Sequence, residues 1–302
     1  MTENFATSLE VREDATGPAG LIAGPYRLDA TSALLGRETL TSIQRRDFWR
    51  AVTKTLPIIS AHGLGWEFDV GDCDSLELVL DAMADPGRST DSAGVRTWRF
   101  GRPESIRRFD FIIDPVEAGH FELLRAGCQS AQIIMERGRL ASCVTRWGGQ
   151  ELSTTDTSTD STPLQNQTFA AAPTCTIEIE DFTGPVFSGA LLLQRDIEPA
   201  GYDETGVASG FKGQSVVDIL GRLACRASTA DFADMMAGDV LERSVVITMT
   251  AGTRRRVLTM PACRLEVGER QLIGQGTYEH LIEFAVIRTT DQDCLSVTSE
   301  EI

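Results

Sequence analysis

The chain of 302 residues is strongly acidic, with 44 Asp and Glu against 28 Lys and Arg and a formal net charge of -16 at pH 7. This balance disfavours tight nucleic-acid binding, which needs a basic surface to neutralise phosphates. No apolar run approaches the roughly 20 residues that span a bilayer, and residues 1–14 lack the apolar core and basic head of a signal peptide. We therefore expect a protein made in the cytoplasm, without a membrane partner, and long enough for two domains of ordinary size.

The sequence lacks the residue spacing of a catalytic or metal site. The seven cysteines are scattered and never form a Cys-x-x-Cys pair, and the three histidines are isolated: His62, His120 and His280. An acidic cluster around Gly71 has its glycine at the wrong position for a calcium loop. We therefore predict a protein that is not an enzyme and that binds no metal and no cofactor.

The amino-terminal third begins with a polar stretch, residues 1–20, which predicts a flexible arm. The segment 44–56 then concentrates bases and aromatic side chains. Its simplest interpretation is an exposed loop whose aromatics pack on a neighbour, with a nucleic-acid patch as the alternative. Residues 57–60, 66–70 and 95–100 have strand composition, and residues 76–80 fit a strand or a helix equally well by periodicity.

The middle of the chain contains the clearest alternation, at residues 108–114. Phe109, Phe111 and Ile113 alternate with positions that include Asp110, which predicts a strand in a sheet buried on one face. Residues 117–126 predict a short helix, with Gly127 as its carboxy-terminal glycine. Residues 132–136 and 140–147 predict a hairpin after it.

A change of composition separates the two halves. Residues 149–173 are rich in Ser, Thr, Asp and Gln, which predicts a polar linker between a first domain at 21–148 and a second at 174–290. In the second half, strands are predicted at 174–180, 186–195, 216–226, 243–250, 254–260, 263–267 and 280–288. A second short helix is predicted at 230–236. Residues 291–302 predict an acidic tail.

Between two of these strands lies a long stretch with four glycines, residues 196–213. Loops of this length without regular structure are usually functional or become ordered on a partner. We therefore expect it to be a contact loop.

An ordered repeat relates the two halves. Phe121 to Gly127 reads FELLRAG and Phe232 to Gly238 reads FADMMAG, and at nearly the same offset Met135 matches Met249. Each copy follows an apolar strand and precedes a hairpin. The repeat spacing is too long for a solenoid and indicates two tandem domains of one fold.

These features together resemble the tail tube protein of long-tailed (siphovirus-type) bacteriophages in its two-domain form. The resemblance is strongest over residues 186–288, in the order strand, long loop, a Gly-Gln-Ser-Val-Val-Asp strand, helix and paired strands, and a weaker copy covers residues 40–147. It implies a mainly β fold with two tandem β-sandwich or split-barrel domains, each with one short α-helix. It also implies that sheets join edge to edge between subunits, that three chains complete a pseudo-sixfold ring, and that rings stack into a hollow tube for DNA delivery.

The resemblance further implies roles for particular residues and partners. The loop would reach the adjacent ring through Ile197, Glu198, Pro199, Tyr202, Asp203, Glu204, Phe211 and Lys212, and its counterpart in the first domain would be Arg45, Arg46, Phe48, Trp49 and Arg50. The lumen would be lined by Asp110, Glu136, Asp218, Ser244, Thr248 and Thr250, whose acids repel phosphate so that double-stranded DNA passes without binding. Partners would be further copies of the chain, the tape measure protein during assembly, and tail terminator and baseplate or tail-tip proteins, in a virion tail assembled in the host cytoplasm.

Two other classes of function stay open at this point. A cytoplasmic β-sandwich binding module would hold a ligand or a partner through the stretch 196–213. A hydrolase would use an acidic site that no motif reveals. Assembly into rings or tubes distinguishes the tube subunit from both.

Overall fold

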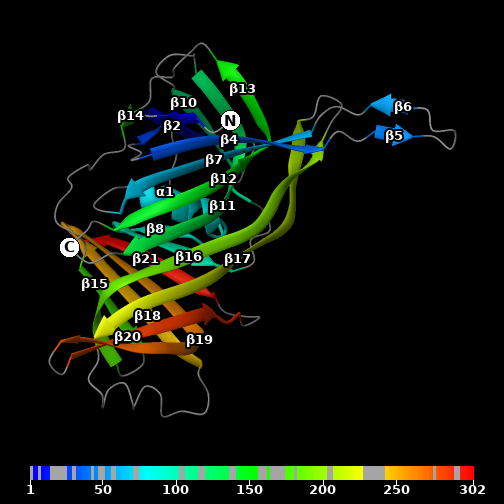
Figure 1. Ribbon diagram of the computed structural model, residues 1–302. Helices are drawn as coiled ribbons and strands as arrows, with labels where there is room; N and C mark the ends of the chain where they lie inside the picture. Colours follow the sequence, from blue (N-terminus) through cyan, green and yellow to red (C-terminus); the bar gives the residue numbers. More distant parts are fainter. Residues whose placement is uncertain are drawn as a thin grey trace.

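The computed structural model describes residues 3–5, 8–13, 26–28, 32–41, 44–46, 52–55, 59–70, 75–101, 106–114, 120–135, 141–155, 162–163, 174–179, 182–202, 207–226, 242–274, 277–288 and 293–302. The expectation of a mainly β fold is confirmed, because nearly every described element is a strand and most belong to one large sheet (Figure 1).

The first half of the chain contains the helix, α1 (Ser75–Met83), and most of the shorter strands. These are β1 (Glu3–Phe5), β2 (Ser8–Glu13), β3 (Tyr26–Leu28), β4 (Ser32–Thr41), β5 (Gln44–Arg46), β6 (Val52–Thr55), β7 (Ile59–Asp69), β8 (Thr90–Ser92), β9 (Val95–Phe100), β10 (Phe109–Asp114), β11 (His120–Met135), β12 (Ser142–Gly149) and β13 (Glu151–Thr155). The remaining strands are β14 (Thr162–Pro163), β15 (Thr174–Ile179), β16 (Phe182–Tyr202), β17 (Ala208–Arg226), β18 (Glu242–Ala251), β19 (Arg254–Gly274), β20 (Thr277–Val286) and β21 (Leu295–Glu301).

Strand β11 belongs to both layers of the first half. Its beginning pairs with β10 and β13, and its end, from Gly127 onward, pairs with β12, which in turn pairs with β7 and through it with β4. Aromatic rings fill the space between the layers, and Phe111 packs edge-on against Trp147 with ring centroids 4.8 Å apart. Burial of such large apolar surfaces is the main stabilising term of this half.

The second half closes into a barrel. Pairings run from β15 to β16, β17, β20, β19 and β18 and then back to β15. Alternate side chains point inward, as at Val245, Ile247 and Met249 of β18, all of which are buried. Closing the strands in this way removes two sheet edges that would otherwise expose unpaired backbone groups.

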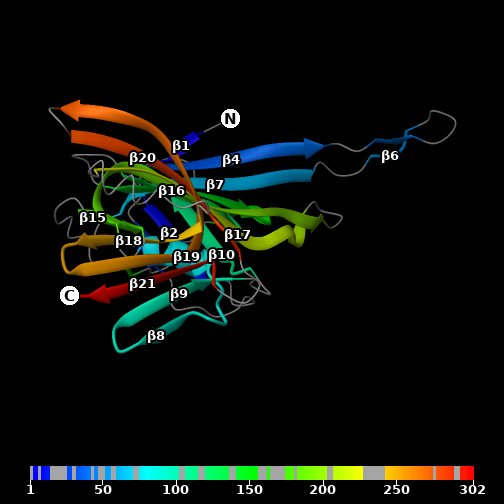
Figure 2. The same cartoon turned by 90° about the horizontal axis from the view of Figure 1, so that it is seen from below.

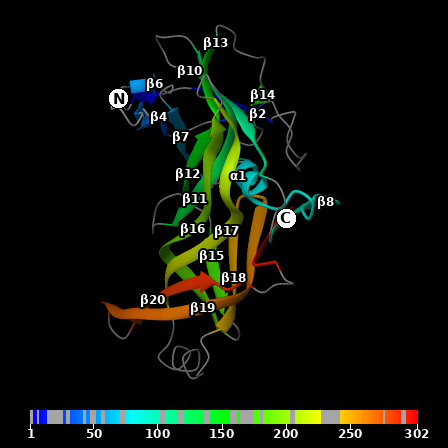
Figure 3. The ribbon, with the colours of Figure 1, turned by 90° about the vertical axis from the view of Figure 1, so that its right-hand side faces the viewer.

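The two halves share one sheet and one core. Residues Ser130 to Met135 of β11 pair with Gly189 to Gln194 of β16, and β21, from the end of the chain, pairs with β9 of the first half. Figure 3 shows the long β16–β17 hairpin running the length of the molecule. Buried side chains of both halves form a continuous apolar cluster.

The prediction of a helix at 117–126 is wrong for the described part, because residues from His120 onward are strand β11. Arg125 has a φ of 51°, and at this point the strand passes from one layer to the other. The kink separates the buried Leu123 and Ala126 by three positions, which imitates the spacing of a helix face. The undecided segment 76–80 is helical instead, and the second predicted helix, 230–236, lies outside the described residues.

Three segments predicted to lack structure contain strands. The predicted amino-terminal arm includes β1 and β2, and Leu9 and Val11 of β2 are buried against β10. The predicted linker includes β13, which pairs with β11. The predicted acidic tail includes β21, where Leu295 and Val297 are buried and the intervening Ser296 is partly exposed.

Candidate assembly surfaces

The stretch 196–213 is the outer part of the β16–β17 hairpin, so the prediction of an irregular loop is wrong. The two strands pair from Val186 and Cys225 outward to Tyr202 and Ala208, with register shifts near Val186 and near Arg195. Asp203 and Glu204 lie outside the described residues, at the turn. The two strands alternate between buried and exposed positions, as at Ile197 and Pro199, which are buried, and Glu198, which is exposed. The glycines and the proline of the segment make this alternation hard to recognise in the sequence.

This hairpin is anchored on the first half of the chain. A Cβ at Gly127 would lie 3.1 Å from Cδ1 of Ile197 and 3.2 Å from Cζ of Phe211, so both side chains pack over this glycine. The Nε2 of Gln129 donates to the carbonyl of Ile197 at 3.0 Å, and the amide of Ala208 donates to the carbonyl of Gln150 at 3.2 Å. On the opposite, exposed side, Lys212 pairs with Glu198 at 3.0 Å. Three of the eight predicted contact residues, Ile197, Pro199 and Phe211, are therefore used in internal packing.

Arg195 fixes the same hairpin to helix α1. Its buried guanidinium donates to the carbonyls of Ala82 at 3.4 Å and Met83 at 2.5 Å, at the carboxy-terminal end of the helix. These carbonyls have no partners within the helix and carry the negative end of its dipole. Burial lowers the pKa of Arg195 to about 10, which leaves it charged at neutral pH.

Two acids on α1 extend this connection to other strands. Glu77 accepts from Arg96 of β9 at 2.5 Å, from Arg254 of β19 at 2.9 Å and from the hydroxyl of Ser299 at 2.7 Å. Asp81, one turn later, accepts from the indole of Trp98 at 3.1 Å and pairs with the buried Arg107. Buried charges of this kind need such partners, and these partners tie the helix to both halves.

The basic segment at 44–56 contains a second hairpin, which extends β4 and β7 beyond the body. Strands β5 and β6 pair with each other in a sheet of their own, and Figures 1 and 2 show them standing away from the rest of the chain. Arg45 and Arg46 lie in β5, whereas Phe48, Trp49 and Arg50 lie outside the described residues. We call the β5–β6 hairpin the distal arm.

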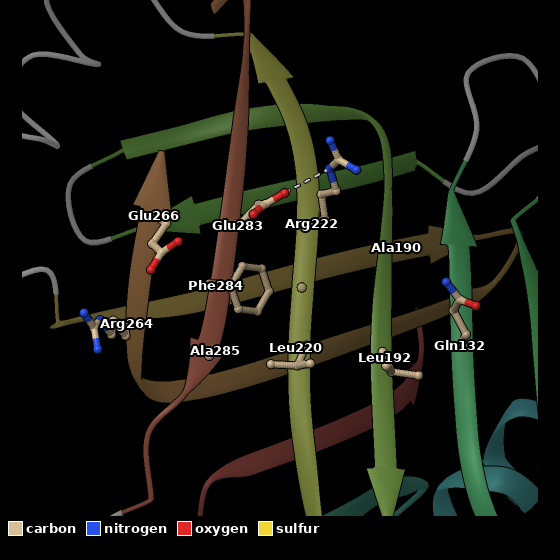
Figure 4. A pocket seen from close by; sticks show the side chains of 11 residues that line it. Gln132, Ala190, Leu192, Leu220, Arg222, Arg264, Glu266, Glu283, Phe284 and Ala285 are labelled. Carbon is tan, nitrogen blue, oxygen red and sulfur yellow. Dashed lines mark ion pairs between the residues drawn. The ribbon is translucent and has the colours of Figure 1, made fainter. Parts of the chain in front are cut away.

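A hollow of about 450 Å³ lies on the outer face of the shared sheet (Figure 4). Its apolar floor is made by Ala190 and Leu192 of β16, Leu220 of β17 and Ala285 of β20. The ring of Phe284 crosses Gly221, where any Cβ would come within 2.0 Å of the ring, so glycine is required at this position.

Charged side chains of both signs surround the hollow. Arg222 pairs with Glu283 at 3.2 Å, and Arg264 and Glu266 stand on β19. Within the described part of the chain, neither Arg264 nor Glu266 forms an ion pair or side-chain hydrogen bond. The sequence reasoning missed this surface, and the available signal was the adjacent pair Ile219 and Leu220, which places an apolar side chain on each face of one strand.

The residues predicted to line a lumen do not share one face. Asp218 is exposed on β17, where it pairs with Arg288 at 2.9 Å, whereas Ser244, Thr248 and Thr250 point outward from β18, across the barrel from β17. Asp110 accepts from the amide of Arg125 at 2.7 Å in the other layer of the first half. Glu136 lies outside the described residues.

The described side chains offer no grouping typical of catalysis. No three side chains of the His, Cys, Asp and Glu types gather there in a way that could hold a metal ion. Burial raises the pKa of Cys128, Cys175, Cys225 and Cys263 to about 12, so these thiols stay protonated near neutral pH and are poor nucleophiles. In the same part of the chain, no helix is both long and apolar enough to cross a membrane.

No known protein-family model matches the chain, and no curated protein matches it significantly.

Proposed function

We propose that this chain is a structural subunit that assembles with further copies of itself into stacked rings, forming a hollow tube of the phage-tail type. In this proposal the two halves act as two tube domains, three chains close a pseudo-sixfold ring, and DNA passes through the lumen to the host. The role is structural and needs no catalytic residue and no cofactor. Tape measure, terminator and baseplate or tip proteins would be its partners in the virion.

The observation that carries the proposal is the distal arm. A two-stranded hairpin alone is marginally stable in water, because it buries too little surface to offset the entropy of ordering it. Strands β5 and β6 form such a hairpin beyond the end of the β4–β7 pair. An arm of this kind gains stability by packing on a second molecule.

Open strand edges support the same proposal. Among the described pairings, β1 pairs only with β4, and β8 pairs only with β9. Residues 90–92 of β8 are exposed. An edge strand presents unpaired backbone donors and acceptors, and a neighbouring subunit can complete them by adding a strand of its own.

The acidic composition is compatible with a DNA conduit. A net charge of -16 keeps separate subunits soluble and repels phosphate groups.

A binding module that works through residues 196–213 has weaker support. Ile197 and Pro199 are buried, and the hairpin is held by Gln129 and Gln150, so little of it is free to enclose a ligand.

Electron microscopy of the purified protein over a range of concentrations tests the proposal. Rings with pseudo-sixfold symmetry, and tubes built from them, are the expected result. A version in which a two-residue turn replaces residues 44–55 should form rings without long tubes. A protein that stays monomeric at every concentration refutes the proposed function.

A further inference from the structure

The outer face of the shared sheet carries an apolar row that crosses several strands. By register, Val144 of β12 lies opposite Gln132 of β11, which lies opposite Leu192, then Leu220, then Ala285. Among the described residues only three large hydrophobic side chains count as exposed, and two of them are in this row: Val144 at 36% and Leu220 at 46%. Exposed apolar side chains that gather in one place mark an interaction site.

The position of the row limits what can bind there. It lies on the face of the sheet, where the backbone groups of β16 and β17 are already paired in the ladder, so the partner cannot join as an added strand. The surface is hollowed, so an identical surface cannot fill it. Its rim carries two acids, Glu266 and Glu283, beside two arginines, so it offers a nucleic acid no net positive charge. The partner is therefore a protruding protein element with apolar side chains, and because Glu283 is already paired with Arg222, Glu266 is the acid left for a basic side chain of that element.

The distal arm of a second copy has this composition. Its described strands contain Arg45, Arg46 and Lys54 and no acid, although the whole chain carries a net charge of -16. Val52 lies in β6, and the sequence between the two strands, residues 47–51, adds Phe48 and Trp49 together with one acid, Asp47, and one base, Arg50. A basic arm on an acidic protein is attracted to every other copy, and this attraction speeds their encounter.

The arm and the hollow lie at different ends of one molecule. Figures 1 and 2 show the arm extending past one end of the body, whereas β19 and β20, which border the hollow, lie toward the other end. A contact between two different surfaces is heterologous, so it repeats from copy to copy and builds rings or filaments instead of closed dimers.

We propose that the distal arm of one copy binds in the hollow of the next copy, with Leu192, Leu220 and Ala285 as the apolar floor and Glu266 as an acceptor for an arm arginine. The proposal rests on the proposed self-assembly and adds to it the surface that receives the arm. Arg264, beside Glu266, limits the arm to one position because it repels a basic side chain that does not lie next to Glu266.

Two matched variants test the contact in the full chain. Leu220→Arg fills the hollow with a charge, and since Leu220 is half exposed the core stays intact. The double variant Arg45→Glu, Arg46→Glu reverses the sign of the charge at two positions of the arm. Each variant alone should lower the association constant for head-to-tail assembly, measured by light scattering, by at least about tenfold. This is the loss expected when a central interface contact is removed. Thr248→Arg, on the opposite side of the barrel, is the control and should assemble as the wild type does.

Mixing the two variants gives the decisive result. The Leu220→Arg chain keeps an unchanged arm, and the Arg45→Glu, Arg46→Glu chain keeps an unchanged hollow. One arm–hollow contact should therefore form between the two chains, and no third chain should add to the pair. Glu266→Arg, a milder change, should weaken association in the same direction. Variants that assemble as the wild type does, or a mixture that forms no junction, overturn the arm contact.

The outcomes separate this inference from the proposed function. Tubes that persist in both variants leave the proposed function intact and refute the arm contact. Open head-to-tail filaments that Leu220→Arg abolishes, without any rings or tubes, support the arm contact and refute the tube.

Discussion

Two long hairpins of this chain are placed differently: one packs on the body of the molecule and the other extends away from it. The β16–β17 hairpin lies on the body and has its outer part anchored at Gly127, Gln129 and Gln150. The β4–β7 hairpin continues as the distal arm, away from the body. The resemblance to tail tube proteins implied that the two segments are counterparts. The difference shows that a partner surface elsewhere in the chain, and not the hairpin itself, decides whether a hairpin packs inward or extends outward.

The anchor depends on residues that are distant in sequence. Gly127 provides space for Ile197 and Phe211, and the end of α1 provides acceptors for Arg195. Within the described residues, β5 and β6 pair only with each other. The two hairpins should therefore respond very differently to mutation.

The largest effect is expected for Arg195→Ala. The change removes two hydrogen bonds from a charged donor and leaves a cavity under the hairpin, with a cost of about 4 kcal/mol in the free energy of unfolding. Arg222→Ala, on the neighbouring strand, is the control and should cost less than about 1 kcal/mol because its ion pair is exposed. Urea unfolding followed by circular dichroism measures both. Equal costs would show that Arg195 does not anchor the hairpin.

A smaller loss is expected for Ile197→Ala. The side chain is 3% exposed, and truncating a buried isoleucine costs about 3 kcal/mol through lost burial and the cavity left behind. The same urea experiment measures it, with Glu198→Ala as the matched exposed neighbour. A change below about 1 kcal/mol at Ile197 would contradict the packing over Gly127.

Removal of the distal arm should change the stability of the separate subunit by less than about 1 kcal/mol, because an exposed hairpin contributes little to a core. Replacing residues 44–55 with an Asn-Gly turn makes the test, and the melting temperature of dilute protein is the measurement. A large drop would mean that the arm packs on its own chain.

The smallest effect is expected for Lys212→Ala. Lys212 and Glu198 form an exposed ion pair on the anchored hairpin, and their side chains are 66% and 64% exposed. Such pairs contribute about 0.3 kcal/mol. Thermal unfolding at low and high salt should give nearly identical values for the variant and the wild type. A salt-dependent difference above about 1 kcal/mol would give this pair a larger role than its exposure allows.

Strands with a strict alternation were predictable from the sequence. The patterns at 109–114 and 245–249 predicted strands with one apolar face, and β10 and β18 confirm them. The mainly β class follows from the same patterns. Such strands can be predicted because successive side chains point alternately to the core and to solvent along the whole strand.

The interrupted elements were not predictable. Helix α1 is buried on every side, so Glu77 and Asp81 occupy core positions and no polar face reveals its period. Strand β11 changes layers at Arg125, which shifts the alternation. The hollow also depends on five strands from both halves, and its row of side chains exists only through their register. The two-domain division and the roles of the arm and hairpin residues remain predictions.

The connections of Glu77 have a consequence for the order of events during synthesis. Glu77 lies early in the chain, but two of its partners, Arg254 and Ser299, are translated more than half a chain later. Until they leave the ribosome, the helix carries an acid without its full set of partners, and β9 lacks its neighbour β21. For the self-assembly proposed above, this order means that the contact surfaces are complete only after the whole chain has left the ribosome.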